Sequence, residues 1–227
     1  AGGMRFNDDG KDTSSVTKLA VRQLEALALG GEATVEYWQR VTQIPQAGRF
    51  TVKLVPMDSS ALASKAYAET TWLEAITPGA KGKVVWAYGQ SRMEVDYGSL
   101  SGLTNVWTHW AFVVNPNDNV LRIFRDGILQ GEQSRASALG VTTYTSGSGE
   151  NAQIKSVALA LAVGGFDGQL AEFRLWNVAR NEGDIRCAKD QPLLGTEPGL
   201  MVYYRFLDGE GRTVTDHADG PTQAGSQ

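Results

Sequence analysis

The most suggestive ionisable side chains in the sequence are Arg92, Glu94 and Asp96, at alternate positions of one extended segment. Side chains in a strand alternate between its two faces, so these three groups are expected to share a face. Two carboxyl groups on one face can carry out glycoside hydrolysis, one as nucleophile and the other as acid. The competing interpretation is a solvated strand face on which Arg92 pairs with the two carboxylates, and we favour it.

A second acidic cluster lies near the N-terminus, where residues 8–12 read DDGKD. Calcium takes about six to eight oxygen ligands, which acidic loops supply together with carbonyl groups. The spacing is not that of an EF-hand, because no glutamate occupies the twelfth position. Two interpretations remain open. One is a solvated turn, and the other is a structural calcium site formed by Asp8, Asp9 and Asp12 with help from Asp208 or Asp216.

Flat aromatic side chains are the third feature with chemical potential, because the apolar faces of sugars pack on exposed aromatic rings. Three of the six tryptophans, Trp38, Trp110 and Trp176, fall within strand patterns and are expected in the core or half-buried. The better candidates for exposure lie in a segment that fits no motif, or at the start of a strand. These candidate ligand-binding residues are Trp72, Trp86, Tyr88 and Trp107.

Several other kinds of site have little support in the sequence. The two histidines, His109 and His217, are far apart and have no neighbouring cysteine, which disfavours a zinc or catalytic site. We expect His109 to make a hydrogen bond inside the fold. Cys187 is the only cysteine, so no intrachain disulfide can form. Neither a Gly-x-Ser-x-Gly motif nor a phosphate-binding Gly-Lys-Ser/Thr loop occurs.

Length and charge limit the choice of partners. The chain has 227 residues, with 21 basic and 25 acidic side chains and a net charge of −4, which disfavours nucleic acid. The longest apolar run, residues 157–163, is much shorter than the roughly 18–20 residues of a membrane span, so membrane insertion is not expected. We expect one domain over residues 1–220, followed by a flexible tail or linker stub at 221–227. Because the chain begins at Ala1, we expect it to be processed or part of a larger multidomain protein.

Short strands must position these side chains. Alternating apolar and polar residues, bounded by turn signals such as Asp126-Gly127 and the NPNDN segment at 115–119, predict about ten strands. A short helix is expected near residues 179–188. Many short strands without alternating long helices indicate an all-β sandwich or barrel. The predicted strands are 4–6, 33–41, 49–55, 83–88, 92–97, 108–114, 120–125, 154–163, 169–176 and 200–207.

Several of these segments occur in an order that resembles the laminin-G-like, or concanavalin A-like, domains. TVEYWQRV at 34–41, NVWTHWAFVV at 105–114 and VLRIFRDG at 120–127 are similar to strands of that family. So are LAVGGFDGQLAEFRLWNVAR at 161–180 and EPGLMVYYRFLDGEGRTVTD at 197–216. The resemblance extends from residue 34 to residue 216, except for residues 50–102, which match no part of the family pattern and are a candidate region for this protein's particular task.

The resemblance implies an all-β, two-sheet antiparallel jelly-roll sandwich. It also implies a non-catalytic recognition module for carbohydrate or protein ligands, in an extracellular or cell-surface setting and with a structural calcium ion. Glucanases of this fold carry a second catalytic glutamate shortly after the Glu-x-Asp pair, but here Gly98 and Ser99 occupy those positions. A β-glycoside hydrolase is therefore the least favoured alternative. A structural or assembly domain within a larger surface polymer or particle is the other.

Overall fold

The computed structural model describes residues 3–6, 24–25, 31–43, 51–56, 72–77, 82–89, 91–96, 102, 104–134, 143–206 and 214–218. The candidate calcium ligands Asp8, Asp9, Asp12 and Asp208 lie outside these residues, as does the expected tail at 221–227.

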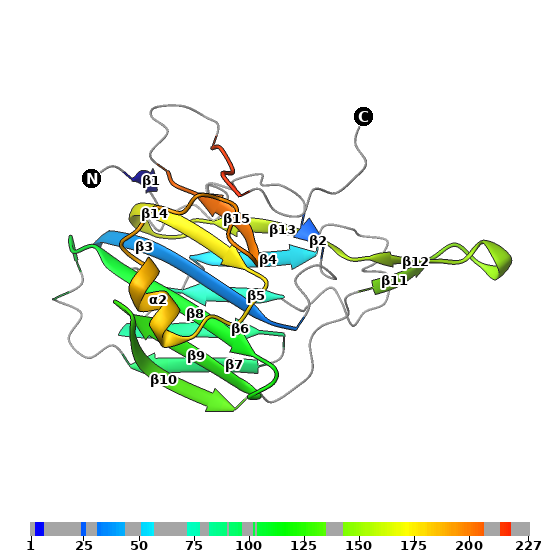
Figure 1. Cartoon of the computed structure of the whole chain (residues 1–227), viewed down its shortest axis with the longest axis horizontal. Coiled ribbons are helices and arrows are strands. Elements are labelled where there is room, and N and C mark those ends of the chain that lie inside the picture. The colour runs from blue at the N-terminus through cyan, green and yellow to red at the C-terminus, as the bar shows by residue number, and fades with distance from the viewer. Residues whose placement is uncertain are drawn as a thin grey trace.

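One layer of the fold is a seven-stranded antiparallel sheet, here called sheet A (Figure 1). β14 (Asp167–Trp176) pairs with β3 (Ala33–Gln43) along one edge. Its other edge is shared by β1 (Met4–Phe6) and β15 (Leu200–Tyr204). Beyond β3 follow β8 (Thr108–Asn115), β9 (Val120–Arg125) and β10 (Ile128–Ser134). Segments far apart in the sequence therefore meet on β14.

The second layer, sheet B, has six antiparallel strands. In spatial order these are β2 (Leu24–Glu25), β13 (Ala158–Val163), β4 (Val52–Pro56), β5 (Leu73–Ile76), β6 (Lys83–Tyr88) and β7 (Ser91–Asp96). Four of the six strands come from the region that matched no family motif in the sequence. The described parts of that region therefore build most of sheet B.

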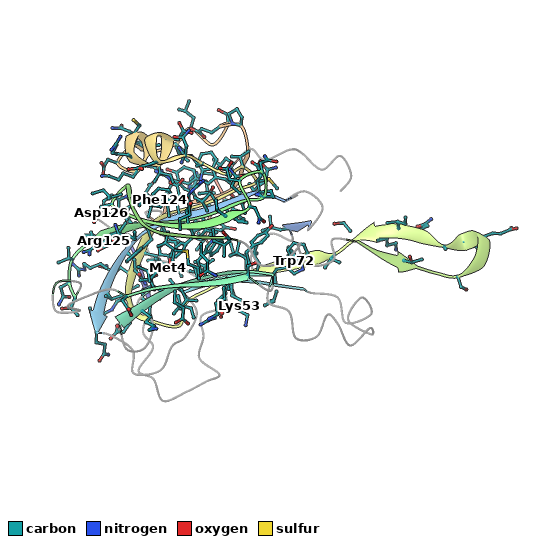
Figure 2. All side chains as sticks on the ribbon, turned by 90° about the horizontal axis from the view of Figure 1, so that it is seen from below. Met4, Lys53, Trp72, Phe124, Arg125 and Asp126 are labelled. Atoms are coloured by element: carbon teal, nitrogen blue, oxygen red, sulfur yellow. The ribbon has the colours of Figure 1, made fainter. Side chains whose placement is uncertain are left out.

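Alternation along the strands explains how the two sheets pack. On β13 every second residue is buried, and on β7 the buried positions Ser91 and Met93 alternate with exposed Arg92 and Glu94. The inward-facing side chains of both sheets form one continuous apolar core, visible between the layers in Figure 2. Each large apolar side chain fully buried in this way stabilises the fold by about 1.5–3 kcal/mol. The all-β antiparallel sandwich is thus confirmed, and it is consistent with a jelly roll.

The predicted short helix is also confirmed as α2 (Glu182–Ala188), which begins a little later than the sequence suggested. The side chain of Asn181 accepts a hydrogen bond from the backbone N–H of Asp184 at 2.9 Å and so caps the helix N-terminus. α2 lies against the outer face of sheet A, where Ile185 packs on Ala111, Val113 and Phe124 (Figure 1). In the part of the chain described here, no helix combines the length and apolar character needed to span a bilayer.

One hairpin stands apart from the sandwich. β11 (Thr143–Ser146) and β12 (Gln153–Ser156) form a separate two-stranded sheet, with a short 3₁₀ turn, η4 (Gly149–Asn151), between them. The hairpin extends away from both layers (Figure 1), and Ile154 on it is 79% exposed. The sequence had predicted a single strand over 154–163. The structure corrects this, because the chain leaves the hairpin at Ser156 and enters sheet B at Ala158.

Candidate functional site

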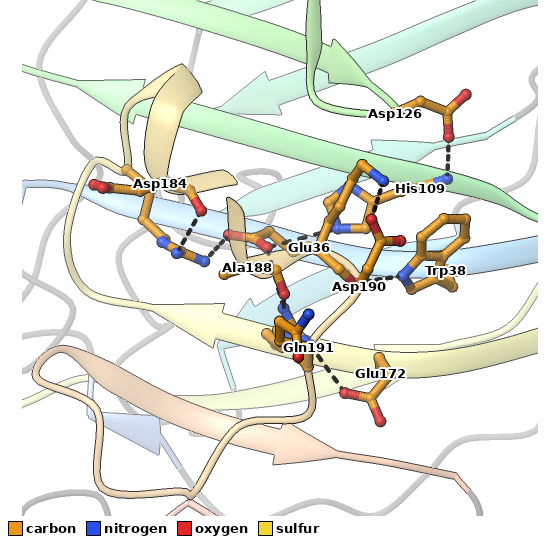
Figure 3. Close-up of polar contacts among 12 residues, drawn as sticks. Glu36, Trp38, His109, Asp126, Glu172, Asp184, Ala188, Asp190 and Gln191 are labelled. Atoms are coloured by element: carbon orange, nitrogen blue, oxygen red, sulfur yellow. Dashed lines mark hydrogen bonds and ion pairs between the residues drawn. The ribbon is translucent and has the colours of Figure 1, made fainter. Parts of the chain in front are cut away.

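A buried polar cluster lies on the outer face of sheet A, beneath α2 (Figure 3). Its centre is Glu36 on β3, which is fully buried. Glu36 Oε1 lies 2.6 Å from Arg180 Nη1, and its Oε2 lies 3.8 Å from Arg174 Nη1 and 3.6 Å from His109 Nε2. The last distance is long for a hydrogen bond, although the His109 side chain is still the group that lowers the pKa of this carboxyl most. These four residues come from β3, β8, β14 and the segment leading into α2.

The same cluster fixes the position of α2. Arg174 donates hydrogen bonds to the carbonyl oxygens of Ala188, at 3.0 Å, and Gln191, at 2.6 Å. Trp38 Nε1 donates to the carbonyl of Lys189 at 2.8 Å, and Arg180 donates to that of Asp184 at 3.0 Å. Carbonyl groups of the helix and of the segment after it thereby gain partners from the sheet below. The charged residues in the family-like motifs thus hold a helix on a sheet.

The ionisation of Glu36 suits this structural role. Burial of the carboxylate alone would raise its pKa, but His109 and the guanidinium groups of Arg180 and Arg174 outweigh that effect. The pKa of Glu36 therefore lies below its usual value, and the side chain is a carboxylate at neutral pH. Because α2 covers the cluster, its groups face protein and not a ligand.

Three of the four candidate ligand-binding aromatics are in the core. Trp72 is 3% exposed, Trp86 is fully buried and Tyr88 is 2% exposed. The expectation that these side chains are exposed is wrong, because β5 and β6 are internal strands of sheet B and the three side chains belong to its core face. Trp86 Nε1 also donates a hydrogen bond to the carbonyl of Val113 in the opposite sheet, at 3.1 Å. These rings are not available for stacking on a sugar in this conformation.

Trp107 is placed differently. It precedes β8 and is half-buried, and a β-carbon at Gly3 would lie 2.8 Å from its Cη2 atom. The indole therefore packs closely against Gly3, just ahead of β1, and crosses one end of sheet A. Where the structure describes aromatic side chains, only Trp38 and Trp107 are partly exposed. Trp38 is already engaged by Lys189 and by the edge of His109, so we take Trp107 as the candidate ring.

A row of polar side chains lies beside Trp107. Arg5 pairs with Gln169, and Gln169 pairs with Arg40, so the three side chains share one face of sheet A. Their neighbours Met4 and Leu170 belong to the core, which places this arginine row (Arg5, Gln169, Arg40) on the outer face. The pairing of β3 with β8 ends at Gln39 and Thr108, and Val41 beyond it bridges Thr104 in the segment that precedes Trp107. Because the indole packs against Gly3, two positions before Arg5, Trp107 lies near the Arg5 end of this row.

A small cavity opens on another side of the sandwich. Its lining includes Asp96, Trp110, Arg125 and Gln130, which is suitable chemistry for a polar ligand. Its volume of about 30 Å³, however, is enough for a water molecule and far below the several hundred Å³ of typical ligand pockets. We therefore assign the candidate site to Trp107 and the arginine row.

The carboxylates on β7 form an exposed ion-paired surface. Glu94 lies 3.2 Å from both Lys83 Nζ and Arg92 Nε, and Arg92 also lies 3.8 Å from Glu74. The bonds from Lys83 and Arg92 hold the pKa of Glu94 below its usual value. Glu94 is therefore a carboxylate at neutral pH, a state that suits a surface ion pair or a nucleophile but not the acid of a glycosidase. These exposed ion pairs are the arrangement expected for a solvated strand face on which Arg92 pairs with a carboxylate.

The described segments contain no group of three or more His, Cys, Asp or Glu side chains suited to a metal. Four of the proposed calcium ligands, Asp8, Asp9, Asp12 and Asp208, lie outside those segments. Asp216, offered as a helper ligand, accepts hydrogen bonds from the backbone N–H groups of Tyr203 and Ala218. Its role in the structure is to bind the segment 214–218 to β15. His217 in that segment lies edge-on to the ring of Tyr203.

Sequence reasoning missed the buried cluster and the arginine row. A signal for the cluster was present at His109, which is a polar residue in the middle of the largely apolar strand β8. The signal for the row was weaker, because Arg5, Arg40 and Gln169 lie on three strands whose pairing could not be read from the sequence.

Several solved structures are similar to this chain, and the first of them supports the fold. A Bacteroides ovatus protein described as carbohydrate binding is 18% identical, with a TM-score of 0.54, and the match covers 82% of this chain and 49% of that protein. The fourth domain of an extracellular arabinanase from Geobacillus stearothermophilus, solved with arabinotriose, is 15% identical, with a TM-score of 0.49 and coverage of 73% and 70%. A heptameric pentraxin from Limulus polyphemus is 10% identical, with a TM-score of 0.48 and coverage of 82% and 79%.

This chain thus spans about half the length of the Bacteroides protein. No curated protein matches the sequence. A family model described as the concanavalin A-like lectin/glucanases superfamily matches residues 10–186, which is most of the chain. The protein therefore belongs to the concanavalin A-like lectin/glucanase superfamily.

Proposed function

We propose that this protein is a non-catalytic recognition module that binds carbohydrate at the end of sheet A marked by Trp107. The observation that carries the proposal is the half-buried Trp107, whose indole packs against Gly3, two positions before Arg5 of the arginine row. The description of the Bacteroides protein as carbohydrate binding agrees with this ligand class by analogy of fold.

The arrangement suits a sugar because a pyranose or furanose ring has an apolar C–H face and a polar edge of hydroxyl groups. The apolar C–H face packs on the indole, while hydroxyl groups at the ring edge accept hydrogen bonds from the arginine row. Packing against Gly3 holds the indole in one orientation, so little side-chain entropy is lost on binding.

The test is binding of a polysaccharide panel, measured by affinity electrophoresis and calorimetry, with the wild-type protein and a Trp107→Ala variant. We expect the variant to lose affinity by about tenfold, the equivalent of one stacking contact. The matched control is Ile154→Ala, which removes an exposed apolar side chain from the remote β11–β12 hairpin. Unchanged binding by a correctly folded Trp107→Ala protein would refute the proposed site.

An extracellular or cell-surface location and a structural calcium ion are secondary proposals that rest on the sequence and the family resemblance. The calcium proposal concerns Asp8, Asp9, Asp12 and Asp208. It predicts that the melting temperature falls on treatment with EDTA and recovers with added calcium. A melting temperature unaffected by either treatment would remove it.

An assembly role is the second candidate, and the β11–β12 hairpin favours it. Isolated two-stranded hairpins are only marginally stable in water, so a partner that covers the hairpin would stabilise it. The expected result is a loss of self-association, or of binding to a neighbouring component, when residues 145–154 are replaced by a short turn. Light scattering that gives the same mass for both proteins, together with undiminished glycan binding, would leave recognition as the preferred role.

A further inference from the structure

We propose that this protein self-assembles head to tail, with the β11–β12 hairpin of one copy adding to the edge strand β10 of the next copy. The proposed carbohydrate function is not required for this contact; assembly, the second candidate function, is the role that the contact would serve. Two observations carry the proposal. The hairpin is exposed and belongs to neither sheet of the sandwich, and β10 is an exposed edge with one neighbour among the described strands.

The surface that would receive the hairpin is β10. It is the last strand of sheet A, and among the strands that the structure describes it pairs only with β9. Six of its seven residues are exposed, so its side chains are accessible to a partner. Two of them, Ile128 and Leu129, are apolar and are 59% and 40% exposed. An exposed edge of this kind can pair with a further strand.

A comparison with the edge of sheet B shows how little β10 is protected. Edge strands are commonly protected by charged side chains, and β7 has three exposed ones, at positions 92, 94 and 96. On β10 the only charged residue is Glu132. A bulge interrupts the strand between Leu129 and Gly131, but residues 131–134 pair regularly with β9, and this run is as long as β12. The chain therefore leaves a regular stretch of edge that matches the hairpin strand in length.

The β11–β12 hairpin would be the donor. Residues 147–155 are all exposed, and the apolar side chain of Ile154 is 79% exposed. Two strands alone are only marginally stable in water, so a third strand would stabilise the hairpin. The hairpin points away from the sandwich, whereas β10 lies along another border of it (Figure 1). It would therefore reach β10 of another molecule rather than its own.

The charges of the two strands are opposite in sign. Lys155 is the only charged residue of β12, as Glu132 is of β10. Arg122 lies 2.6 Å from Glu132 and 3.3 Å from Asp118, so this group of three side chains keeps a net negative charge. A lysine placed beside β10 is attracted to that charge. The other charged residue of the hairpin, Glu150, lies in the η4 turn.

The donor and the acceptor are different surfaces of the same chain, so the contact is heterologous. Repeated from copy to copy, it gives an open chain of molecules or a closed ring. A contact of a few residues on each side is small, so the affinity should be low and the mass should depend on concentration.

The experiment uses two variants that each keep one half of the contact. In the first, residues 145–154 are replaced by a short turn, so that only the acceptor remains. In the second, Leu129→Lys adds to β10 a positive charge that repels Lys155, so that only the donor remains. We expect light scattering to give a mass above that of one chain, rising with concentration, for the wild-type protein. Each variant alone should be a monomer, and a mixture of the two should form a 1:1 complex.

The matched control is Leu194→Lys, which adds the same charge at another exposed leucine and should self-associate like the wild-type protein. Ile128→Lys is a second variant at the same edge and should behave like Leu129→Lys. Melting curves establish that each variant is folded.

The outcomes identify which surface is involved. A wild-type protein that is monomeric at every concentration, or a mixture that forms no complex, would overturn the proposal. Undiminished self-association of both β10 variants would also overturn it, but would leave the assembly role with a different acceptor. Self-association of the protein without the hairpin would indicate edge-to-edge pairing and would exclude the hairpin as donor. None of these outcomes bears on carbohydrate binding at Trp107.

Discussion

Replacing Glu36 by Gln tests the account of the buried cluster most directly. The change keeps the size of the side chain but removes its charge. Arg174 retains hydrogen bonds to the carbonyls of Ala188 and Gln191 and an ion pair with Glu172. Arg180 loses its carboxylate partner at 2.6 Å and keeps the carbonyl of Asp184 and its contact with the ring of Trp176. The variant therefore leaves one largely buried guanidinium without a compensating charge.

The expected cost follows from the burial of both groups. Removing one partner of a buried ion pair costs about 3–5 kcal/mol. Because Arg180 keeps one hydrogen bond and is partly exposed, we expect the lower end, about 3 kcal/mol. For a chain of this length that corresponds to a fall in melting temperature of roughly 6–12 °C.

The measurement is chemical and thermal unfolding followed by circular dichroism, with Glu94→Gln as the control. Glu94 makes exposed ion pairs, so its substitution should change the free energy of unfolding by no more than about 0.5 kcal/mol. Equal effects of the two substitutions would refute the reasoning, because they would mean that the buried network contributes no more than a surface pair.

The effect should also depend on pH. The folded-state pKa of Glu36 is lower than the unfolded value of about 4.5, so the unfolded chain binds the proton more readily. The stabilisation by Glu36 is therefore fully present above that value and is lost as the pH falls through the folded-state pKa. The difference in stability between the wild-type protein and the Gln variant should accordingly shrink below about pH 4.5.

Three further changes test other parts of the structure. Asn181→Ala removes the cap of α2 and should cost about 1 kcal/mol in urea unfolding, whereas Asn181→Asp should not. Gly168→Ala places a β-carbon 2.2 Å from the carbonyl oxygen of Arg40. We expect the free energy of unfolding to fall by more than about 2 kcal/mol and the arginine row to be displaced. A melting temperature equal to that of the wild-type protein would contradict this expectation. Burial and the hydrogen bond to Glu172 raise the pKa of Tyr203. Absorbance titration should therefore show a tyrosine that ionises above pH 10, and this signal should be missing in the Tyr203→Phe variant. The stabilisation that the Tyr203 hydroxyl contributes should be lost as the pH rises through its folded-state pKa.

The sequence predicted those strands whose alternation is strong and local. β6 and β9 have the bounds that the pattern indicated, because apolar residues and turn signals define both ends. β5 has four residues and was missed, since so short a run has too few alternations to be recognised. β12 is polar and exposed, so it has no apolar face to mark it.

The candidate site was harder to predict because it depends on which strands are neighbours. Trp72 and Trp86 were expected at the surface because their region matched no family motif, yet that region forms internal strands. Arg5 and Arg40 share a face only because β14 lies between β1 and β3. Trp107 was identified correctly as partly exposed, since it stands outside the alternation of β8.

The position of β14 also constrains the order of folding. Met4 pairs with Leu170, and Phe173 pairs with Tyr204, so the edge of sheet A beyond β14 is completed by both ends of the chain. Closing such long loops slows the search for native contacts, and folding on a millisecond-to-second timescale is typical of sandwiches of this kind. During synthesis β3 and β8 can pair early, whereas β1 must wait for β14 to leave the ribosome. Until then one edge of β3 remains open, and that interval is when the nascent protein is most exposed to aggregation.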